Sequence, residues 1–181
     1  MSEIVRQARA LAIEMHDRFQ HTRSNGEPYW RHPERVVATL TAAHLPPEVL
    51  AAAWLHDVPE DCAADLAECE ALLADIERRF GPQVASITRE VTNFFGPEAT
   101  MDEKQARLVE HAAHMSAHAK WIKLADRRDN ISGMDNWKPE KQQRYAAATV
   151  RLLAALQPIP PGAEPLTAEI AQRAQSILNR A

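Results

Sequence analysis

The 181-residue sequence has little of what would place it in several large classes of protein. Its apolar runs are far shorter than the ~18 residues that a membrane span requires. Its first residues have neither the apolar core nor the cleavage site of a signal peptide. Two cysteines, Cys62 and Cys69, are too few for a disulfide framework, and we expect them to be reduced thiols. These absences predict a cytoplasmic protein that does not enter a membrane.

Clusters of positive charge are missing as well. The formal net charge is −4, and a brief basic stretch such as Arg78-Arg79 lies beside Glu77. A protein that binds nucleic acid irrespective of sequence needs clustered Lys and Arg to displace the counterions of the phosphates. We therefore expect no nucleic-acid partner.

Glycine is scarce, with five residues in the chain, whereas alanine, leucine and glutamate are frequent. These three residues favour helices, in which a glycine costs about 1 kcal/mol relative to alanine. Apolar residues recur at helical spacing, and no segment alternates as a strand would. The sequence therefore predicts an all-α fold with helices near residues 3–20, 33–44, 48–58, 65–80, 83–95, 102–114, 118–131 and 139–156.

Prolines separate the end of the chain from the rest. Residues 157–166 are rich in proline, which predicts a stiff linker. Residues 167–181 have the pattern of an amphipathic helix. We expect a single domain over residues 1–156, followed by the linker and this C-terminal helix. The helix would pack either on its own domain or on a second subunit, so the sequence is compatible with a homo-oligomer.

Charged side chains occur where the pattern predicts burial. Residues 48–58 are apolar almost all round, which predicts an internal helix, yet they contain the pair His56-Asp57. Pro59 should end or kink this helix. Asp126 follows another apolar stretch, residues 121–125. A buried carboxylate costs several kcal/mol unless it is paired or bound to a cation.

These carboxylates have two interpretations. Two buried carboxylates from distant segments would repel each other unless a cation lay between them. Two imidazoles, from His32 and His56, and two carboxylates, from Asp57 and Asp126, form a ligand set that suits Mn²⁺, Fe²⁺ or Zn²⁺. Alternatively, the acids cap helices or pair with neighbouring arginines. The spacing alone leaves both interpretations open.

Three blocks of the sequence together resemble a known family. They are Thr22–Tyr29 with His32-Pro33, the run His56–Asp61, and Lys123–Arg127 with Asn130. Their order and intervals resemble the H…HD…D signature of the HD superfamily of metal-dependent phosphohydrolases. More narrowly, they resemble the hydrolase domain of RelA/SpoT-type alarmone enzymes. The likeness covers about residues 5–156 and no synthetase region follows, which indicates the small stand-alone alarmone hydrolases, including the metazoan SpoT homologue.

The resemblance implies an HD-domain helical bundle that removes the 3′-pyrophosphate of (p)ppGpp. It implies a metal ion, usually Mn²⁺ in this family although another divalent ion would suit the ligands, bound by His32, His56, Asp57 and Asp126. It also implies that Glu60 and Asp61 orient or deprotonate the attacking water. A metal lowers the pKa of bound water, and a nearby carboxylate takes the proton. The alternative for this pair is an ordinary solvated loop.

The same resemblance implies contacts with a nucleotide. Arg23 matches the loop arginine that stacks on the purine, and Asn130 matches the asparagine that contacts the sugar. Lys104 and Arg107 lie on the helix that faces the phosphates in the short hydrolases. An ordinary loop arginine and a solvated helix face would give the same pattern.

Two departures from the family pattern concern the nucleoside. Arg23 is followed by Ser24-Asn25, so one common basic contact is missing. Asp129 stands where many relatives have His or Tyr, which changes the charge beside the nucleoside site. An adenine alarmone is therefore an alternative to a guanine alarmone.

His111, His114 and His118 lie near one helical stripe and could bind a second metal. A break near Ser116 would separate them, and surface histidines give the same pattern. The sequence leaves both interpretations open.

The sequence thus predicts a hydrolase that acts on a small nucleotide and releases pyrophosphate from (p)ppGpp-type alarmones. The enzymatic alternative is an HD nucleotide phosphatase of broader range. A non-catalytic alarmone sensor would be expected to lack a metal ligand or the Glu60-Asp61 pair, and all six residues are present. A purely structural scaffold would leave the ligand set unexplained.

Overall fold

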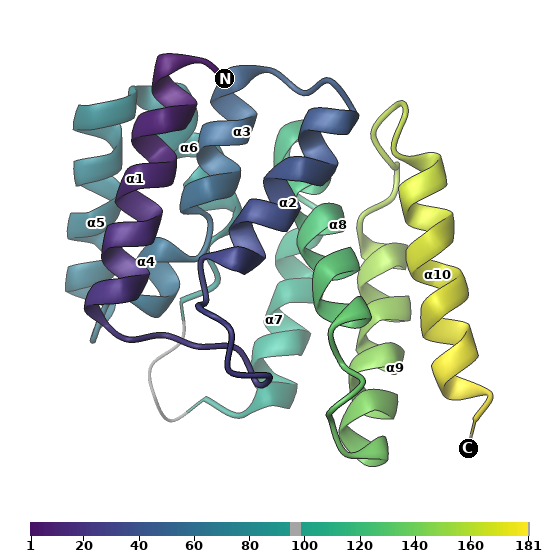
Figure 1. Ribbon diagram of the computed structural model, residues 1–181. Helices are drawn as coiled ribbons and strands as arrows, with labels where there is room; N and C mark the ends of the chain where they lie inside the picture. Colours follow the sequence, from purple (N-terminus) through teal and green to yellow (C-terminus); the bar gives the residue numbers. More distant parts are fainter. Residues whose placement is uncertain (95–98, 181) are drawn as a thin grey trace.

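The computed structural model describes residues 1–94 and 99–180, which form a bundle of helices (Figure 1). Within these ranges the extended backbone is limited to an isolated bridge between Thr22 and Pro28. No helix in them is long and apolar enough to cross a membrane. The all-α prediction is therefore confirmed. The helices are α1 (Glu3–Arg18), α2 (Arg31–Ala42), α3 (Pro47–Leu55), α4 (Val58–Asp61), α5 (Leu66–Phe80), α6 (Pro82–Val91), α7 (Met101–Ala112), α8 (Ala117–Ser132), α9 (Pro139–Ala155) and α10 (Glu164–Leu178).

Helix α3 lies at the centre of the bundle, as its apolar sequence predicts. Val49 and residues 51–55 are buried, and α1, α2, α6 and α8 pack around them. Leu40 of α2 and Ile122 of α8 are fully buried in the same core. Burying each such side chain stabilises the fold by about 1.5–3 kcal/mol. The core therefore fixes α2, α3 and α8 relative to one another, and these helices position the site.

The helix expected over residues 48–58 is divided in two. Helix α3 ends at Leu55, and the single turn α4 begins at Val58. Pro59 has no N–H to donate to the carbonyl oxygen of Leu55, and its ring would clash with that carbonyl in a continuous helix. Pro59 suits the first turn of α4 instead. His56 and Asp57 consequently lie at the junction between the two helices.

The helix expected over residues 83–95 is shorter than predicted. Helix α6 ends at Val91 and Thr92 is extended, while Phe95 lies outside the described residues. The next backbone N–H, that of Asn93, donates to Glu60 Oε2 at 3.0 Å. The extended segment after α6 therefore donates a backbone hydrogen bond to the carboxylate of Glu60 in α4.

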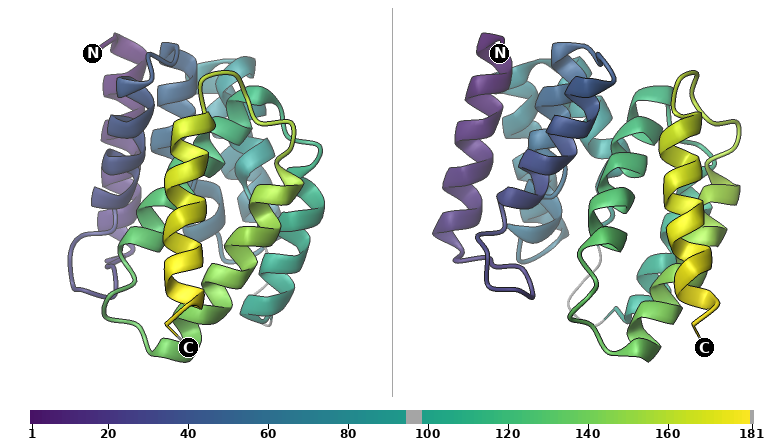
Figure 2. Two further views of the ribbon diagram at one scale, coloured as in Figure 1. Left: turned by 90° about the vertical axis from the view of Figure 1, so that its right-hand side faces the viewer. Right: turned by 45° about the vertical axis from the view of Figure 1, so that its right-hand side comes forward.

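The C-terminal helix α10 packs on its own chain. It begins at Glu164 rather than at 167, because Pro165 suits a first helical turn. Residue 181, at the end of the expected range, is not among the described residues. Both views of Figure 2 place α10 alongside α8 and α9, where Ile170 and Ala174 are buried.

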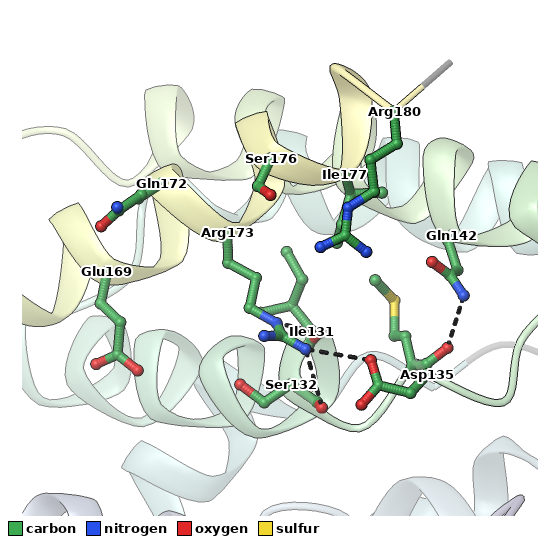
Figure 3. A pocket seen from close by; sticks show the side chains of 11 residues that line it. Ile131, Ser132, Asp135, Gln142, Glu169, Gln172, Arg173, Ser176, Ile177 and Arg180 are labelled. Carbon is green, nitrogen blue, oxygen red and sulfur yellow. Dashed lines mark hydrogen bonds and ion pairs between the residues drawn. The ribbon is translucent and has the colours of Figure 1, made fainter.

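Arg173 fastens α10 to the end of α8 (Figure 3). Its guanidinium donates to the carbonyl oxygens of Ile131 and Ser132 at 3.3 and 3.4 Å, and it pairs with Asp135 at 3.3 Å. A cation at a helix C-terminus is favourable because the last carbonyls carry partial negative charge. A cavity of about 330 Å³ lies beside this contact, and Arg180 and Ser176 of the same segment line it.

Candidate active site

Side chains from three segments meet in one cluster. His32 lies in the first turn of α2, His56 and Asp57 at the α3–α4 junction, and Asp126 in α8. Ligand atoms of His32, His56 and Asp57 lie within 4.8 Å of one another. Asp126 joins them, with Oδ1 at 3.3 Å from His32 Nε2. The structure therefore brings together the four residues predicted to bind a metal.

The two imidazole rings are held with one nitrogen facing inward. His56 Nδ1 lies 2.7 Å from the carbonyl oxygen of Ala53, which can only accept, so Nδ1 carries the hydrogen and Nε2 the lone pair. His32 Nδ1 likewise lies 2.7 Å from Asp129 Oδ2. Both Nε2 atoms are buried without a hydrogen-bond partner. Histidines that bind metals typically donate a hydrogen bond from the other ring nitrogen to a carbonyl or carboxylate oxygen, as these two do.

The spacing of the ligand atoms suits a single ion. Ligand atoms about 2.1–2.2 Å from one ion and at right angles to each other are about 3 Å apart. His56 Nε2 lies 3.1 Å and His32 Nε2 lies 3.5 Å from Asp57 Oδ2. Two imidazoles and two carboxylates at these distances fit a divalent ion of the Mn²⁺, Fe²⁺ or Zn²⁺ class.

The electrostatics of the cluster favour positive charge at its centre. Burial alone would lower the pKa of His32, but the nearby carboxylates of Asp126 and Asp129 raise it to about 9. Burial also opposes ionisation of Asp57, yet the neighbouring His56 and His32 hold the pKa of Asp57 well below its usual value. The raised pKa of His32 reflects the negative charge of the surrounding carboxylates, which a bound cation would balance, and the lowered pKa of Asp57 shows that positive charge beside it stabilises its ionised form.

Helix α4 places the predicted catalytic pair directly after the cluster. Glu60 is partly buried, and its Oε2 accepts from the backbone N–H of Asn93. Burial raises the pKa of Glu60 to about 7, even though the Lys123 ammonium acts to lower it. Asp61 is exposed, with its backbone N–H bonded to the carbonyl oxygen of Asp57 at 2.8 Å. A carboxylate with a pKa near neutrality is well suited to accept and release a proton.

Two residues predicted to contact a nucleoside meet beside the cluster. Arg23 Nη1 donates to Asn130 Oδ1 at 2.9 Å, and Asn130 Nδ2 donates to Asp126 Oδ1 at 2.6 Å. Arg23 lines a cavity of about 290 Å³, together with Asp129 and Gly133. A Cβ at position 133 would lie 3.2 Å from Arg23 Nη2, so glycine permits this close approach. The volume is at the lower end of the ~300–1,000 Å³ of small-molecule sites.

The two basic residues of α7 occupy different places. Lys104 is partly buried, and its charge acts to lower the pKa of Glu60, whose burial raises it. Arg107 is exposed and lines a cavity of about 370 Å³ with Asn93 and His111. Lys104 therefore lies close to the catalytic pair, whereas Arg107 lies further along the same helix.

Three residues contact the metal-ligand cluster in ways that were not predicted from the sequence. Tyr29 Oη donates to Asp57 Oδ2 at 2.9 Å, and the buried Lys123 places Nζ at 3.4 Å from Asp126 Oδ2. Asp129 faces His32 as well as the Arg23 guanidinium, which lies 3.5 Å from Asp129 Oδ2. Residues 123, 126 and 129 recur at three-residue spacing, which puts them on one face of a helix. This spacing was the sequence signal that could have identified Lys123 and Asp129 as neighbours of Asp126, and it does not apply to Tyr29.

His111, His114 and His118 are not brought together. Helix α7 ends at Ala112 and α8 begins at Ala117, so the stripe is interrupted. His111 Nε2 instead lies 3.0 Å from the carbonyl oxygen of Glu90. Among the described residues, the clusters with metal-binding geometry do not include these three.

Known proteins share this sequence and this fold. Residues 8–157 match the HD domain family. The guanosine-3′,5′-bis(diphosphate) 3′-pyrophosphohydrolase MESH1 of Danio rerio is 36% identical over 143 residues, 75% of this chain and 74% of the relative. The bifunctional (p)ppGpp synthase/hydrolase SpoT of Escherichia coli K12 is 33% identical over 156 residues, 84% of this chain but 21% of that protein. The chain thus spans about a fifth of the length of such bacterial relatives.

A solved structure shares the fold over almost the whole chain. It is a metazoan orthologue of SpoT described as hydrolysing ppGpp and playing a role in starvation responses. The two superpose with a TM-score of 0.77 and 26% identity, over 99% of this chain and 96% of the other. The chain therefore belongs to the HD domain family, in the group that includes MESH1 and the matching region of SpoT.

Proposed function

We propose that this protein is a metal-dependent hydrolase that removes the 3′-pyrophosphate of (p)ppGpp-type alarmones and gives GDP or GTP. The observation that carries the proposal is the buried cluster of His32, His56, Asp57 and Asp126, with two unpartnered imidazole nitrogens inside it. The names of the relatives, which describe 3′-pyrophosphohydrolases, support this choice of substrate.

These four residues are proposed to hold one divalent ion. Mn²⁺ is the proposed metal, because two carboxylates give the site a hard character, and Fe²⁺ or Zn²⁺ would suit the same donors. When bound, the ion would lower the pKa of water and offset phosphate charge. Asp129 and the carbonyl oxygen of Ala53 keep the rings of His32 and His56 in the ligand orientation.

Glu60 is proposed to accept the proton of the attacking water. Its pKa of about 7 and the bond from the Asn93 N–H support this role, since they give a proton acceptor of suitable strength in a fixed position. Asp61 is proposed to orient the same water from the next position of α4. The water oxygen attacks the phosphorus attached to the ribose 3′-oxygen. The bond between this phosphorus and the ribose 3′-oxygen breaks, pyrophosphate leaves with the oxygen of the water, and the 3′-oxygen takes up a proton.

The nucleotide is proposed to lie along the surface from Arg23 to α7. Arg23 would stack on the purine while its bond to Asn130 fixes the guanidinium beside the cavity. Asn130 would contact the ribose, and Lys104 and Arg107 the phosphates. Asp129 lies at the edge of this cavity, so an adenine alarmone is the alternative to a guanine alarmone.

The catalytic unit is proposed to comprise residues 1–156. The segment 157–166 would then carry α10 back along α8 and α9, where it packs in this structure. Cys62 and Cys69 are both buried free thiols, which supports a reducing, cytoplasmic setting. A small nucleotide is the proposed partner.

The test is a product assay on the purified protein with Mn²⁺. It compares ppGpp, ppApp, NADPH and a deoxynucleoside monophosphate, and it separates pyrophosphate from orthophosphate. We expect pyrophosphate from ppGpp or ppApp, and no turnover with Asp126→Asn, which keeps the shape of the side chain but removes a charged ligand. Orthophosphate from the other substrates would identify a broader phosphatase. Binding of ppGpp without turnover would identify a sensor.

A further inference from the structure

A second cluster of metal-ligating side chains lies beside the active site. It contains His16 near the end of α1, His21 in the following loop and Cys62 at the end of α4, and their ligand atoms lie within 4.8 Å of one another. His16 is fully buried and Cys62 is 5% exposed. Figure 1 shows the C-terminal end of α1 next to α4, where these segments meet. None of the three residues belongs to the proposed catalytic centre.

The arrangement is more than apolar packing of buried side chains. His16 Nδ1 lies 3.3 Å from His21 Nδ1, and His16 Nε2 is buried without any hydrogen-bond partner. An ion held by the two Nδ1 atoms would leave Nε2 of His16 unpaired, as a bond between the rings does, so the Nε2 atom favours neither arrangement. Tetrahedral Zn²⁺ with Zn–N bonds of about 2.0–2.1 Å separates its nitrogen ligands by about 3.3 Å. The observed Nδ1–Nδ1 distance agrees with that geometry.

We propose that His16, His21 and Cys62 form a second metal site, which binds Zn²⁺. Two imidazoles and one sulfur make a softer ligand set than the two imidazoles and two carboxylates of the catalytic centre. The two sites should therefore select different metals. On binding, the thiol of Cys62 loses its proton to solvent as the sulfur–zinc bond forms, and a water molecule completes the four ligands.

The protonation state of His16 and the position of His21 both suit metal binding. Burial lowers the pKa of His16 to about 4, so this imidazole is neutral and has a free lone pair near pH 7. The ring of Phe19 stacks on that of His21, with centroids 5.7 Å apart. The backbone N–H of His21 donates to the carbonyl oxygen of His16 at 3.0 Å, which holds the loop against α1.

The position of the site indicates what the ion would do. It would tie α1 and the loop that carries Arg23 to the end of α4, directly after Glu60 and Asp61. The Tyr29 ring lies 4.7 Å from that of His16, and its hydroxyl donates to Asp57. Zn²⁺ would therefore hold α1 and this loop in place beside the active site. Because it binds the folded chain, it would also raise the free energy of unfolding.

Cobalt replaces zinc in the test because a thiolate ligand gives Co²⁺ a characteristic near-ultraviolet charge-transfer absorption. Co²⁺ is titrated into the metal-free full chain, where it also occupies the catalytic centre because it binds such sites more tightly than Mn²⁺ does. The catalytic centre has no sulfur ligand, so we expect the thiolate absorption to arise from the second site alone. Cys62→Ser should abolish this absorption. Cys69→Ser, which alters the other buried thiol, should retain it, as should Asp126→Asn in the other centre.

A negative result is unambiguous for the wild-type protein. Absence of the thiolate absorption at saturating Co²⁺, or its persistence in Cys62→Ser, would overturn the proposal. His21→Gln provides a second variant at a partly exposed position, in case Cys62→Ser does not fold. It should fold normally by circular dichroism and show a smaller rise in melting temperature with Zn²⁺ than the wild type, because only Zn²⁺ at the catalytic centre still contributes. An unchanged rise would also overturn the proposal. Because these readouts do not involve turnover, they are independent of the proposed alarmone hydrolysis.

Discussion

Replacing Asp129 with Asn should weaken metal binding without removing a ligand. Asp129 Oδ2 lies 2.7 Å from His32 Nδ1, and Oδ1 lies 2.6 Å from Arg35 Nε. The side chain is 12% exposed, so solvent does little to replace its charge. Asparagine keeps the shape and one acceptor oxygen but not the negative charge. His32 would then be a poorer electron-pair donor to a cation at Nε2.

The size of the effect follows from what Asp129 contacts. Loss of such an outer partner typically costs about 10–100-fold in metal affinity. Arg35 keeps its pair with Glu27 at 2.7 Å and is 43% exposed, so the lost Arg35–Asp129 pair should contribute less than about 1 kcal/mol. The change should therefore act mainly through His32. We expect about tenfold weaker Mn²⁺ binding, equivalent to about 1.4 kcal/mol.

The assay is a titration of Mn²⁺ by calorimetry, with free Mn²⁺ followed by electron paramagnetic resonance. The matched control is Asp135→Asn, because Asp135 is an exposed acid near the end of the same helix and pairs with Arg173. The control should bind Mn²⁺ as the wild type does. Equal affinities for wild type and Asp129→Asn would refute the reasoning that this carboxylate tunes His32.

Three further predictions concern the proposed active site. Glu60→Gln should retain the metal while the rate falls about 10²–10⁴-fold, and a rate near that of the wild type in a single-turnover assay would exclude Glu60 as the proton acceptor. Removal of divalent ions with a chelator should lower the melting temperature. Metal at 100 times its Kd contributes about 2.7 kcal/mol, or roughly 5–10 °C for a chain of this size, and an unchanged melting temperature would argue against a bound ion. Arg23→Ala should raise KM for the alarmone more than it lowers kcat, because a stacking contact of about 0.5–2 kcal/mol is lost from the bound nucleotide. A loss confined to kcat would contradict that role.

Local patterns were enough to predict much of the architecture. The uniformly apolar residues 49–55 predicted a central helix, because a helix without a polar face must be buried on all sides. That Asp57 and Asp126 need a cation or an ion pair followed from physical reasoning, since buried carboxylates need compensation, but the spacing left both interpretations open. The resemblance to a family then decided between these interpretations and favoured one metal site that includes His32 and His56.

Tertiary contacts determined the features that the sequence did not predict. Helix α6 ends early where the Asn93 N–H binds Glu60, which lies 33 positions earlier in the chain. Asp129 was interpreted as a neighbour of the nucleoside, and its contact with His32 depends on how α2 and α8 pack. His16, His21 and Cys62 share no periodicity, and only the fold brings them together.

The most direct test of the central claim relates product formation to metal content. Metal-free protein is loaded stepwise with Mn²⁺, and pyrophosphate released from ppGpp is measured against bound metal. The account predicts that the rate rises in proportion to the first Mn²⁺ bound per chain and then reaches a plateau, and that Asp126→Asn stays near zero throughout. Pyrophosphate release that is independent of bound metal, or orthophosphate as the only product, would contradict it.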